Sequence, residues 1–396
     1  MKAKLLIILF IMYGCKIENK RCDNFITIDV TKKYPKKELI LQDFLDIEYI
    51  QLETNNEFIT SASLQDISGN IILMKDLNRA NTGNIFIFNR DGNALRKINH
   101  LGQGGKEYTN ILDIKIDKYN NEIFVNNLFS YQILVYDTLG NFKRKLKHKE
   151  GFFYNQIADF NQSYLICHDG LQEFNKPDIK RNCFLIISKL DGSIKEIQIP
   201  YIKKISMLMM VKDITGEIIS DVYTFYNKQL IPYHNNWILI ETSADTIYTY
   251  SQDHEMDPFI VRTPSIQSMN PEVFLFVGVL TNRYYFMQTV KKQFNFEKRT
   301  GFPTTELVYD RQENSIFECI VLNADFTDKR PISLVYQAPS PPAILNNEEI
   351  AFMIRLEVPD LLEAYEMGKL KGELKKIAAN LNEDSNPVLM LAKYKK

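Results

Sequence analysis

The polar residues that could do chemistry in this chain come directly after short apolar segments that recur along it. They are Asp76, Asn127, His168 and Asp169, and His100 adds a second imidazole in a glycine-rich linker. Carboxylate, amide and imidazole groups bind metal ions and polar ligands. Because the segments before them are of one kind, we expect these residues to open loops on one face of the fold and to form a ligand-binding ring there. Asp and Asn also favour the start of turns, so a purely structural role fits them equally well.

Motifs for catalysis or for a bound cofactor are absent from the sequence. It contains no GxSxG, no HExxH and no pair of histidines four residues apart. The segment Leu101–Lys106 (LGQGGK) resembles a phosphate loop, but His100 stands where that pattern needs its first glycine and Glu107 where it needs Ser or Thr. We therefore predict no catalytic residue, no metal and no cofactor, and interpret these glycines as a tight passage between two structural units.

Five cysteines occur in the sequence, and none is part of a CxxC motif or of a zinc-ligand spacing. Cys167 and Cys183 lie in apolar runs that look like strands. Small buried thiols and a disulfide between them are both compatible with these positions, the disulfide only in an oxidising compartment.

The elements that must position these residues are recognisable from a repeat. NIFIFNRDGNALRKI (Asn84–Ile98) and QILVYDTLGNFKRKL (Gln132–Leu146) align without a gap, 48 residues apart. Each copy is an apolar run, a polar turn that ends in glycine (Gly92 or Gly140), and a second run in which apolar and polar residues alternate. This pattern predicts a β-hairpin, and a period of about 40–50 residues is typical of propeller blades.

Similar pairs of strand-like segments continue to the end of the chain and number six. Their first members begin at Ile71, Ile123, Tyr164, Trp237, Tyr284 and Ala351. The recurrence predicts an all-β fold, a six-bladed β-propeller of four-stranded antiparallel blades that occupies residues 25–396 as one domain. We interpret Tyr201–Leu230 and Asp253–Val273 as long insertions, and Lys291–Thr304 as a smaller, basic and aromatic one that forms a solvated loop.

One segment near the C-terminus has helical periodicity. Leucines and other apolar residues recur at helical spacing over residues 359–381. We predict one amphipathic helix there, packed on its own domain and inserted before a closing strand at Pro387–Lys395.

The N-terminus has the features of a targeting segment. A basic start is followed by the apolar run Leu5–Met12 and then by Tyr13-Gly14-Cys15. Eight apolar residues are too few to span a bilayer. The Gly-Cys ending resembles a bacterial lipoprotein signal peptide, which implies cleavage after residue 14, a lipid on Cys15 and a lipidated tether over residues 15–24.

The lipoprotein signal, the hairpin copies, the linker His100–Asp117 (HLGQGGKEYTNILDIKID) and the C-terminal Glu383–Lys395 (EDSNPVLMLAKYK) together resemble the six-bladed β-propeller lipoproteins of Gram-negative gut bacteria, relatives of NHL-repeat propellers. This resemblance implies a protein of the cell envelope, anchored by lipid in the outer membrane with the chain on the periplasmic side or at the cell surface.

Three functions remain open from the sequence. The first is a binding module for a peptide, a glycan or a partner protein of the envelope. The second, which the resemblance to NHL-like propellers implies, is a metal-dependent lyase or lactonase, with His100, His168 and Asp169 as the first suspects. The third is a structural envelope subunit held through the two long insertions. The formal net charge of −1 argues against nucleic acid as a partner.

Overall fold

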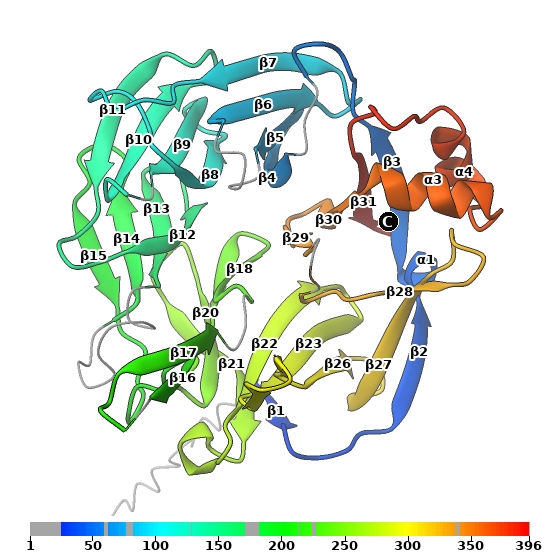
Figure 1. Cartoon of the computed structure of the whole chain (residues 1–396). Coiled ribbons are helices and arrows are strands. Elements are labelled where there is room, and N and C mark those ends of the chain that lie inside the picture. The colour runs from blue at the N-terminus through cyan, green and yellow to red at the C-terminus, as the bar shows by residue number, and fades with distance from the viewer. Residues whose placement is uncertain are drawn as a thin grey trace, which may run out of the picture.

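Six β-sheets stand around a central axis in the computed structural model (Figure 1). The structure describes residues 25–58, 62–76, 82–127, 129–170, 182–212, 214–223, 227–336, 338 and 341–395. The six-bladed, four-stranded antiparallel propeller predicted from the repeat is confirmed. Cys15 lies outside the described residues.

Each of the first three blades is a meander of four consecutive strands. Blade one consists of β4 (Ser63–Ser68), β5 (Ile71–Lys75), β6 (Asn84–Asn89) and β7 (Ala94–Asn99). Blade two consists of β8 (Ile111–Asp117), β9 (Glu122–Asn127), β10 (Gln132–Asp137) and β11 (Phe142–Lys147). Blade three consists of β12 (Tyr154–Asp159), β13 (Tyr164–Asp169), β14 (Phe184–Ser188) and β15 (Ile194–Ile197).

Each of the other three blades also pairs with a strand from the N-terminal segment of the chain. Blade four consists of β18 (Leu230–Tyr233), β19 (Asn236–Leu239), β20 (Thr246–Tyr250) and β21 (Met256–Thr263). Blade five consists of β22 (Val273–Leu280), β23 (Tyr284–Lys291), β26 (Thr304–Asp310) and β27 (Ser315–Asn323), with β28 (Arg330–Ile332) at its edge. Blade six consists of β29 (Ala343–Ile344), β30 (Ile350–Leu356), β31 (Val388–Tyr394) and β3 (Leu45–Gln51).

The predicted hairpin copies are the outer hairpins of the first two blades, β6–β7 and β10–β11. Their turns need a backbone that only glycine adopts easily, since φ is +88° at Gly92 and +91° at Gly140. The core lies between neighbouring blades: Leu73 of blade one packs in the same cluster as Val125 and Leu134 of blade two. The middle strands are therefore buried on both faces, which explains their nearly continuous apolar sequences.

The ring closes through the N-terminal segment. The outermost strand of blade six is β3, which pairs antiparallel with β31. The C-terminal strand that we expected at Pro387–Lys395 exists, but it is the third strand of its blade. The first strand of the described chain is β1 (Ile26–Asp29). It pairs parallel with β21 of blade four.

A further strand lies where the sequence predicted only a lysine-rich connection. It is β2 (Lys36–Ile40), which pairs parallel with β27 of blade five and leads through α1 (Leu41–Phe44) into β3. Residues 26–51, the N-terminal strap, therefore cross the outer edges of three successive blades. Such coverage protects edges that would otherwise invite aggregation.

The helix predicted over residues 359–381 is two helices, α3 (Val358–Glu366) and α4 (Gly372–Ala378), placed between β30 and β31 as expected. The prediction of one helix was wrong because Gly368 and Gly372 adopt φ of +66° and +53°, which ends one helix and offsets the next. Leu361 and Leu374 are buried between the helices and the blade, so the apolar stripe packs on its own domain.

The insertions differ from the sequence interpretation in one place. Tyr201–Leu230 contains an added hairpin of β16 (Leu208–Lys212) and β17 (Ile218–Tyr223). Asp253–Val273 is not an insertion, because it holds β21, the outer strand of blade four, and the short helix η1 (Ile266–Ser268). Lys291–Thr304 holds a small hairpin of β24 (Phe294–Asn295) and β25 (Thr300–Gly301).

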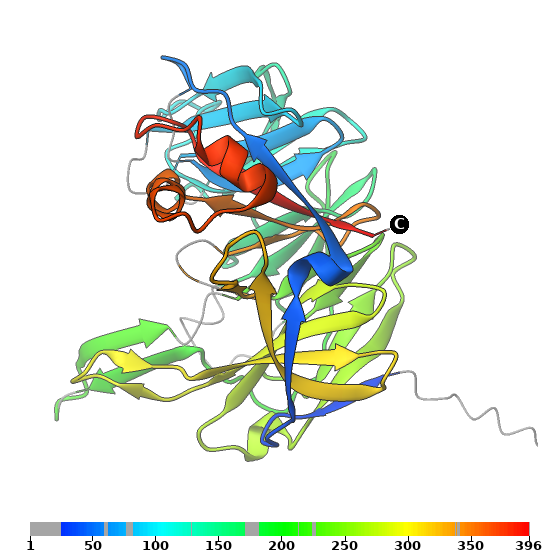
Figure 2. The same cartoon turned by 90° about the vertical axis from the view of Figure 1, so that its right-hand side faces the viewer.

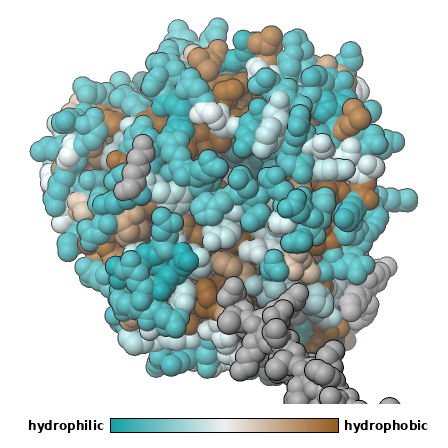
Figure 3. Space-filling view, turned by 180° about the vertical axis from the view of Figure 1, so that it is seen from behind, coloured by the Kyte–Doolittle hydropathy of each residue, from teal (hydrophilic) through white to brown (hydrophobic). Residues whose placement is uncertain are grey.

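The hairpins β16–β17 and β24–β25 project from the same face of the propeller (Figure 2). The opposite face is covered mostly by hydrophilic residues, with apolar ones in separate patches (Figure 3). Among the described residues, no helix combines the length and the apolar character needed to cross a bilayer.

Candidate functional site

A cavity lies on the face of the propeller from which the two hairpins project, and blade five forms most of its lining. The strands β22, β23 and β27 have eight, eight and nine residues, whereas those of blade one have five or six. Because its strands are longer, the sheet of blade five extends further toward the face from which the hairpins project. An open cavity of about 580 Å³ lies over it, between this sheet, the end of β17 and the segment after β28.

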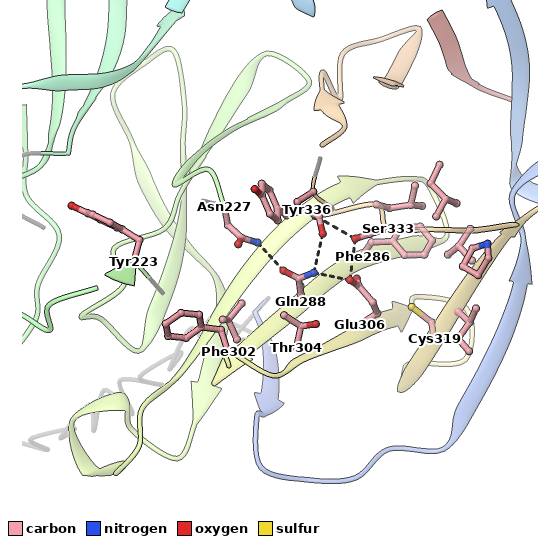
Figure 4. Close-up of a pocket in the computed structure, with 17 residues that line it drawn as sticks. Tyr223, Asn227, Phe286, Gln288, Phe302, Thr304, Glu306, Cys319, Ser333 and Tyr336 are labelled. Carbon is pink, nitrogen blue, oxygen red and sulfur yellow. Dashed lines mark hydrogen bonds between the residues drawn. The ribbon is translucent and has the colours of Figure 1, made fainter. Parts of the chain in front are cut away.

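A row of polar side chains crosses the floor of this cavity (Figure 4). Gln288 on β23 lies directly opposite Glu306 on β26. The Gln288 amide donates to Glu306 Oε1 at 2.6 Å and accepts from the Asn227 amide at 2.9 Å. The Ser333 hydroxyl donates to the same Glu306 oxygen at 3.0 Å. Both bonds to Glu306 end on Oε1, so its Oε2 has no partner among the described residues.

The surroundings of Glu306 are mainly apolar. Burial raises the pKa of this carboxyl, and the hydrogen bonds from Gln288 and Ser333 only partly oppose that effect. Cys319 on the neighbouring strand is a buried thiol whose pKa burial raises far above its usual value, with the Glu306 charge as a second cause. A thiol with a raised pKa is a poor nucleophile, so Cys319 serves as an apolar wall of the cavity.

Apolar side chains make up the rest of the cavity wall. They are contributed by all the surrounding elements and include Tyr223, Phe286, Val290, Phe302, Ile332 and Leu334. Thr304 also lines the cavity; it is exposed and lies on the same face of the sheet as Glu306, because it is two residues before Glu306 on β26. No lysine, arginine or histidine lines the cavity among the described residues.

The segment after β28 is held in place by a close backbone approach. The Leu334 carbonyl accepts a hydrogen bond from the Val279 N–H at 2.9 Å. A Cβ added at Gly278 would lie 2.1 Å from that carbonyl oxygen, so only glycine permits this approach. This segment forms part of the wall of two cavities at once, because Tyr336 lines both the blade-five cavity and the mouth of the central channel.

The central channel opens on the same face through a mouth of about 600 Å³. Tyr223, Asn227 and Tyr336 are common to the mouth and to the blade-five cavity. A smaller cavity of about 180 Å³ beside α3 shares Pro331 and Ile332 with the blade-five cavity. The three cavities adjoin one another at these shared residues, and together we call them the entrance groove.

Deeper in the channel, polar side chains tie each blade to the next. Asp66, Asp113 and Gln156 lie on the innermost strands of blades one, two and three, each at a register shift. Each accepts a backbone hydrogen bond from the innermost strand of the following blade, the donors being Ile116 (2.9 Å), Ile157 (3.2 Å) and Leu230 (3.1 Å). These side chains therefore serve the assembly of the ring.

Two lysines accompany these acids in the channel. Lys115 Nζ lies 3.6 Å from Asp113 Oδ1 and donates to the Gln65 carbonyl. Burial lowers the pKa of Lys228, and the charge on Lys115 adds to this effect while Asp113 opposes it. Lys228 lines both the mouth and the deeper channel.

The residues predicted to form a ligand ring have partners within or between blades. Asn127 accepts from the backbone N–H and hydroxyl of Thr109. His168 is buried and its Nδ1 lies 2.8 Å from the Asn155 side-chain oxygen, while Asp169 accepts from the Phe153 N–H at 2.8 Å.

Burial lowers the pKa of His168 to about 3, which keeps its imidazole neutral. The His100 ring stacks on Tyr136 with centroids 4.9 Å apart, and its Nε2 lies 2.7 Å from the Gly140 carbonyl oxygen. Asp76 accepts from the Thr82 hydroxyl. None of the five predicted residues lines the entrance groove, and binding by them stays a prediction.

The structure also shows the surroundings of Cys167 and Cys183 and how side chains that could bind a metal ion are distributed. Cys167 and Cys183 are buried free thiols, and Cys183 donates to Glu241 at 2.7 Å. Within the described ranges, no three His, Cys, Asp or Glu side chains are grouped closely enough to hold a metal ion.

Sequence reasoning missed Gln288, Glu306 and Ser333. One signal was available in β23, a strand of the blade interior. There Gln288 follows the apolar run Tyr284–Met287 and stands two residues before Val290. A buried amide needs partners. What the sequence did not contain was the register that places Glu306 opposite it.

The fold and this site define a propeller scaffold with a groove on the face from which the hairpins project. The comparisons with known proteins agree with the fold. The chain belongs to the family described as "Domain of unknown function (DUF4934)", whose model matches residues 25–393. No curated protein matches the chain in sequence.

Solved structures to which the chain is similar come from several bacteria. A protein of Bacteroides fragilis described as a candidate exported protein is 15% identical, with a TM-score of 0.58 over 94% of this chain and 100% of that chain. A member of the DUF4221 family from Bacteroides vulgatus is 12% identical, with a TM-score of 0.49 over 90% and 99% of the two chains.

Virginiamycin B lyase from Staphylococcus aureus is 9% identical, with a TM-score of 0.39 over 89% of this chain and 100% of that chain. At such identities these likenesses concern the fold alone, and the lyase gives no argument about activity.

Proposed function

We propose that this protein is an exported, lipid-anchored propeller that binds a ligand of the cell envelope in its entrance groove. The observation that carries the proposal is the blade-five cavity of this groove: a mainly apolar, aromatic-walled cavity that holds a carboxylate oxygen without a partner among the described residues. Concave apolar sites with a few convergent polar groups are where proteins bind ligands.

Export and the lipid anchor rest on two further observations. The first residues have the basic, apolar and Gly-Cys pattern of a lipoprotein signal that ends at Cys15. A structural neighbour is described as a candidate exported protein. A Cys15→Ser variant is expected to leave the membrane fraction and to lose incorporation of radiolabelled fatty acid; a variant that stays with membranes would contradict the anchor.

Binding in the groove can be tested before the ligand is known. The full chain is exposed to a mixed library of envelope peptides and oligosaccharides, beside two variants that each add one arginine. Thr304→Arg places the new cation in the blade-five cavity, on the face of the sheet that carries Glu306, and Leu190→Arg places it at a turn where Leu190 is 82% exposed.

The wild-type chain and Leu190→Arg are expected to enrich the same ligands, whereas Thr304→Arg loses them. Equal enrichment by all three chains would show that the ligands bind elsewhere and would overturn the proposed site.

A further inference from the structure

Among its described lining residues, the blade-five cavity has one acidic group and no basic group. Glu306 is the only carboxylate in its wall, and among the described residues no lysine or arginine pairs with it. An ionised carboxylate in apolar surroundings loses hydration that only a nearby cation or hydrogen-bond donor can replace. The cavity therefore favours a ligand that brings its own positive charge.

The position of Glu306 determines the shape of that ligand. Glu306 lies on the floor, in the middle of the polar row (Figure 4), and apolar side chains such as Phe286, Val290 and Ile332 line the cavity around that row. A group that reaches the floor must pass its stem along apolar wall. A methylene chain with a terminal cation matches this arrangement, because long basic side chains bury their stems and keep the charge at the tip.

Aromatic residues strengthen the same preference. Phe302 and Tyr223 border the cavity on one side, and Phe286 and Tyr336 on others. Aromatic faces attract alkylammonium and guanidinium groups by cation–π interaction, which is stronger where water is excluded.

We propose that the blade-five cavity is the recognition pocket for a lysine or arginine side chain of a peptide segment that lies in the entrance groove. This inference rests on the proposed function and names the chemistry of its ligand. The terminal cation pairs with Glu306 Oε2, and the peptide backbone runs past Tyr336 toward the channel mouth, which the shared residues make continuous with the pocket.

A glycan fits the pocket less well. An amino sugar also carries a cation, but its ammonium is attached directly to a ring with several hydroxyl groups. Those hydroxyls would face the apolar wall without partners, which costs free energy for each one buried.

The test compares two small probes that differ only at the tip of one side chain. They are Nα-acetyl-lysine methylamide and Nα-acetyl-norleucine methylamide, titrated into the full chain and followed by saturation-transfer NMR. The lysine probe is expected to bind at least about tenfold more tightly than the norleucine probe, and the preference is expected to vanish in Glu306→Gln. The amide of that variant can still accept from Gln288 and Ser333, so the pocket keeps its hydrogen bonds.

Glu318→Gln is the matched control. Glu318 is on β27 of the same sheet and pairs with Leu307, so its side chain lies on the opposite face from Glu306. It removes the same charge from the protein without touching the pocket, and the preference for lysine is expected to persist. Loss of the preference in both variants would assign it to net charge and overturn the proposal.

The remaining outcomes separate this inference from the proposed function. If Thr304→Arg removes the library ligands but the lysine and norleucine probes bind alike, the groove is the binding site and the assignment of a basic side chain is wrong. That assignment is also wrong if glucosamine competes with the library ligands and the lysine probe does not. If Thr304→Arg has no effect on any ligand, both the proposed site and the assignment fail.

Discussion

At the scale of single residues, burial decides which groups do chemistry. The structure buries the predicted ligand residue His168 inside a blade, and it buries His148 in the same way. His148 Nε2 lies 3.0 Å from the Asn126 side-chain oxygen, and its ring packs on Tyr154 with centroids 4.1 Å apart. Burial lowers the pKa of each imidazole from 6.5 to about 3.

These two histidines make the fold sensitive to acid. Between pH 6.5 and about 3 the unfolded chain binds protons that the folded chain does not, so the free energy of unfolding falls as the pH falls through that window. Replacing both with Gln is expected to flatten the dependence of Tm on pH, measured by calorimetry. An equally steep dependence in the double variant would assign the acid sensitivity to other groups.

A buried ion pair gives a second prediction at this scale. Lys204 Nζ lies 2.8 Å from Glu241 Oε1, and both side chains are almost fully buried. The Lys204 charge is the main favourable influence that lowers the pKa of Glu241 to about 2 against the opposing effect of burial. Glu241→Gln leaves Lys204 charged and unpaired, and is expected to cost about 3–5 kcal/mol in urea unfolding.

The double variant Glu241→Met with Lys204→Met is expected to recover most of that stability at neutral pH. Its stability relative to wild type should rise as the pH falls from 4.5 to about 2, because the contribution of a carboxylate with a lowered pKa is lost in that window. A double variant as unstable as Glu241→Gln would contradict a role for the charges.

At the scale of elements, the entrance groove depends on the segment after β28, whose backbone lies against β22 at Gly278. Gly278→Ala would place a methyl group 2.1 Å from the Leu334 carbonyl oxygen, so the segment that carries Ser333 and Tyr336 must move. We expect a loss of about 1–3 kcal/mol of stability and weaker binding of the lysine probe. Gly105→Ala is the control, since nothing lies within 4 Å of its added Cβ. Unchanged binding in Gly278→Ala would show that this wall does not contact the ligand.

At the scale of the whole molecule, the N-terminal strap holds blades four, five and six together. Its apolar residues, including Ile28, Leu41 and Leu45, are buried in the largest core cluster. Leu41→Ala is expected to lower the free energy of unfolding by about 2–5 kcal/mol, whereas Leu190→Ala on an exposed turn changes it by no more than about 0.5 kcal/mol. If denaturant titrations give equally small changes in the free energy of unfolding for both variants, the strap is not needed for ring closure.

The described part of the chain begins on the face opposite the projecting hairpins, where β1 starts (Figure 2). The entrance groove therefore opens on the side away from the start of β1.

The sequence predicted the architecture well because blades are made from local hairpins. Gly92 and Gly140 mark turns that neighbouring residues determine. The β2 strand was not predicted because its pairing with β27 joins residues nearly 300 positions apart, and Lys36 and Lys37 obscure its apolar alternation. The site was missed for the same reason: Gln288, Glu306 and Ser333 come together only through sheet register and a long linker.

The measurement that tests the central claim most directly is hydrogen exchange of the full chain with and without the strongest ligand from the library. Binding in the entrance groove predicts slower exchange in β23, β26 and residues 331–336, with the opposite face unchanged. Protection confined to the opposite face, or to the loops around Asn127 and His168, would contradict it.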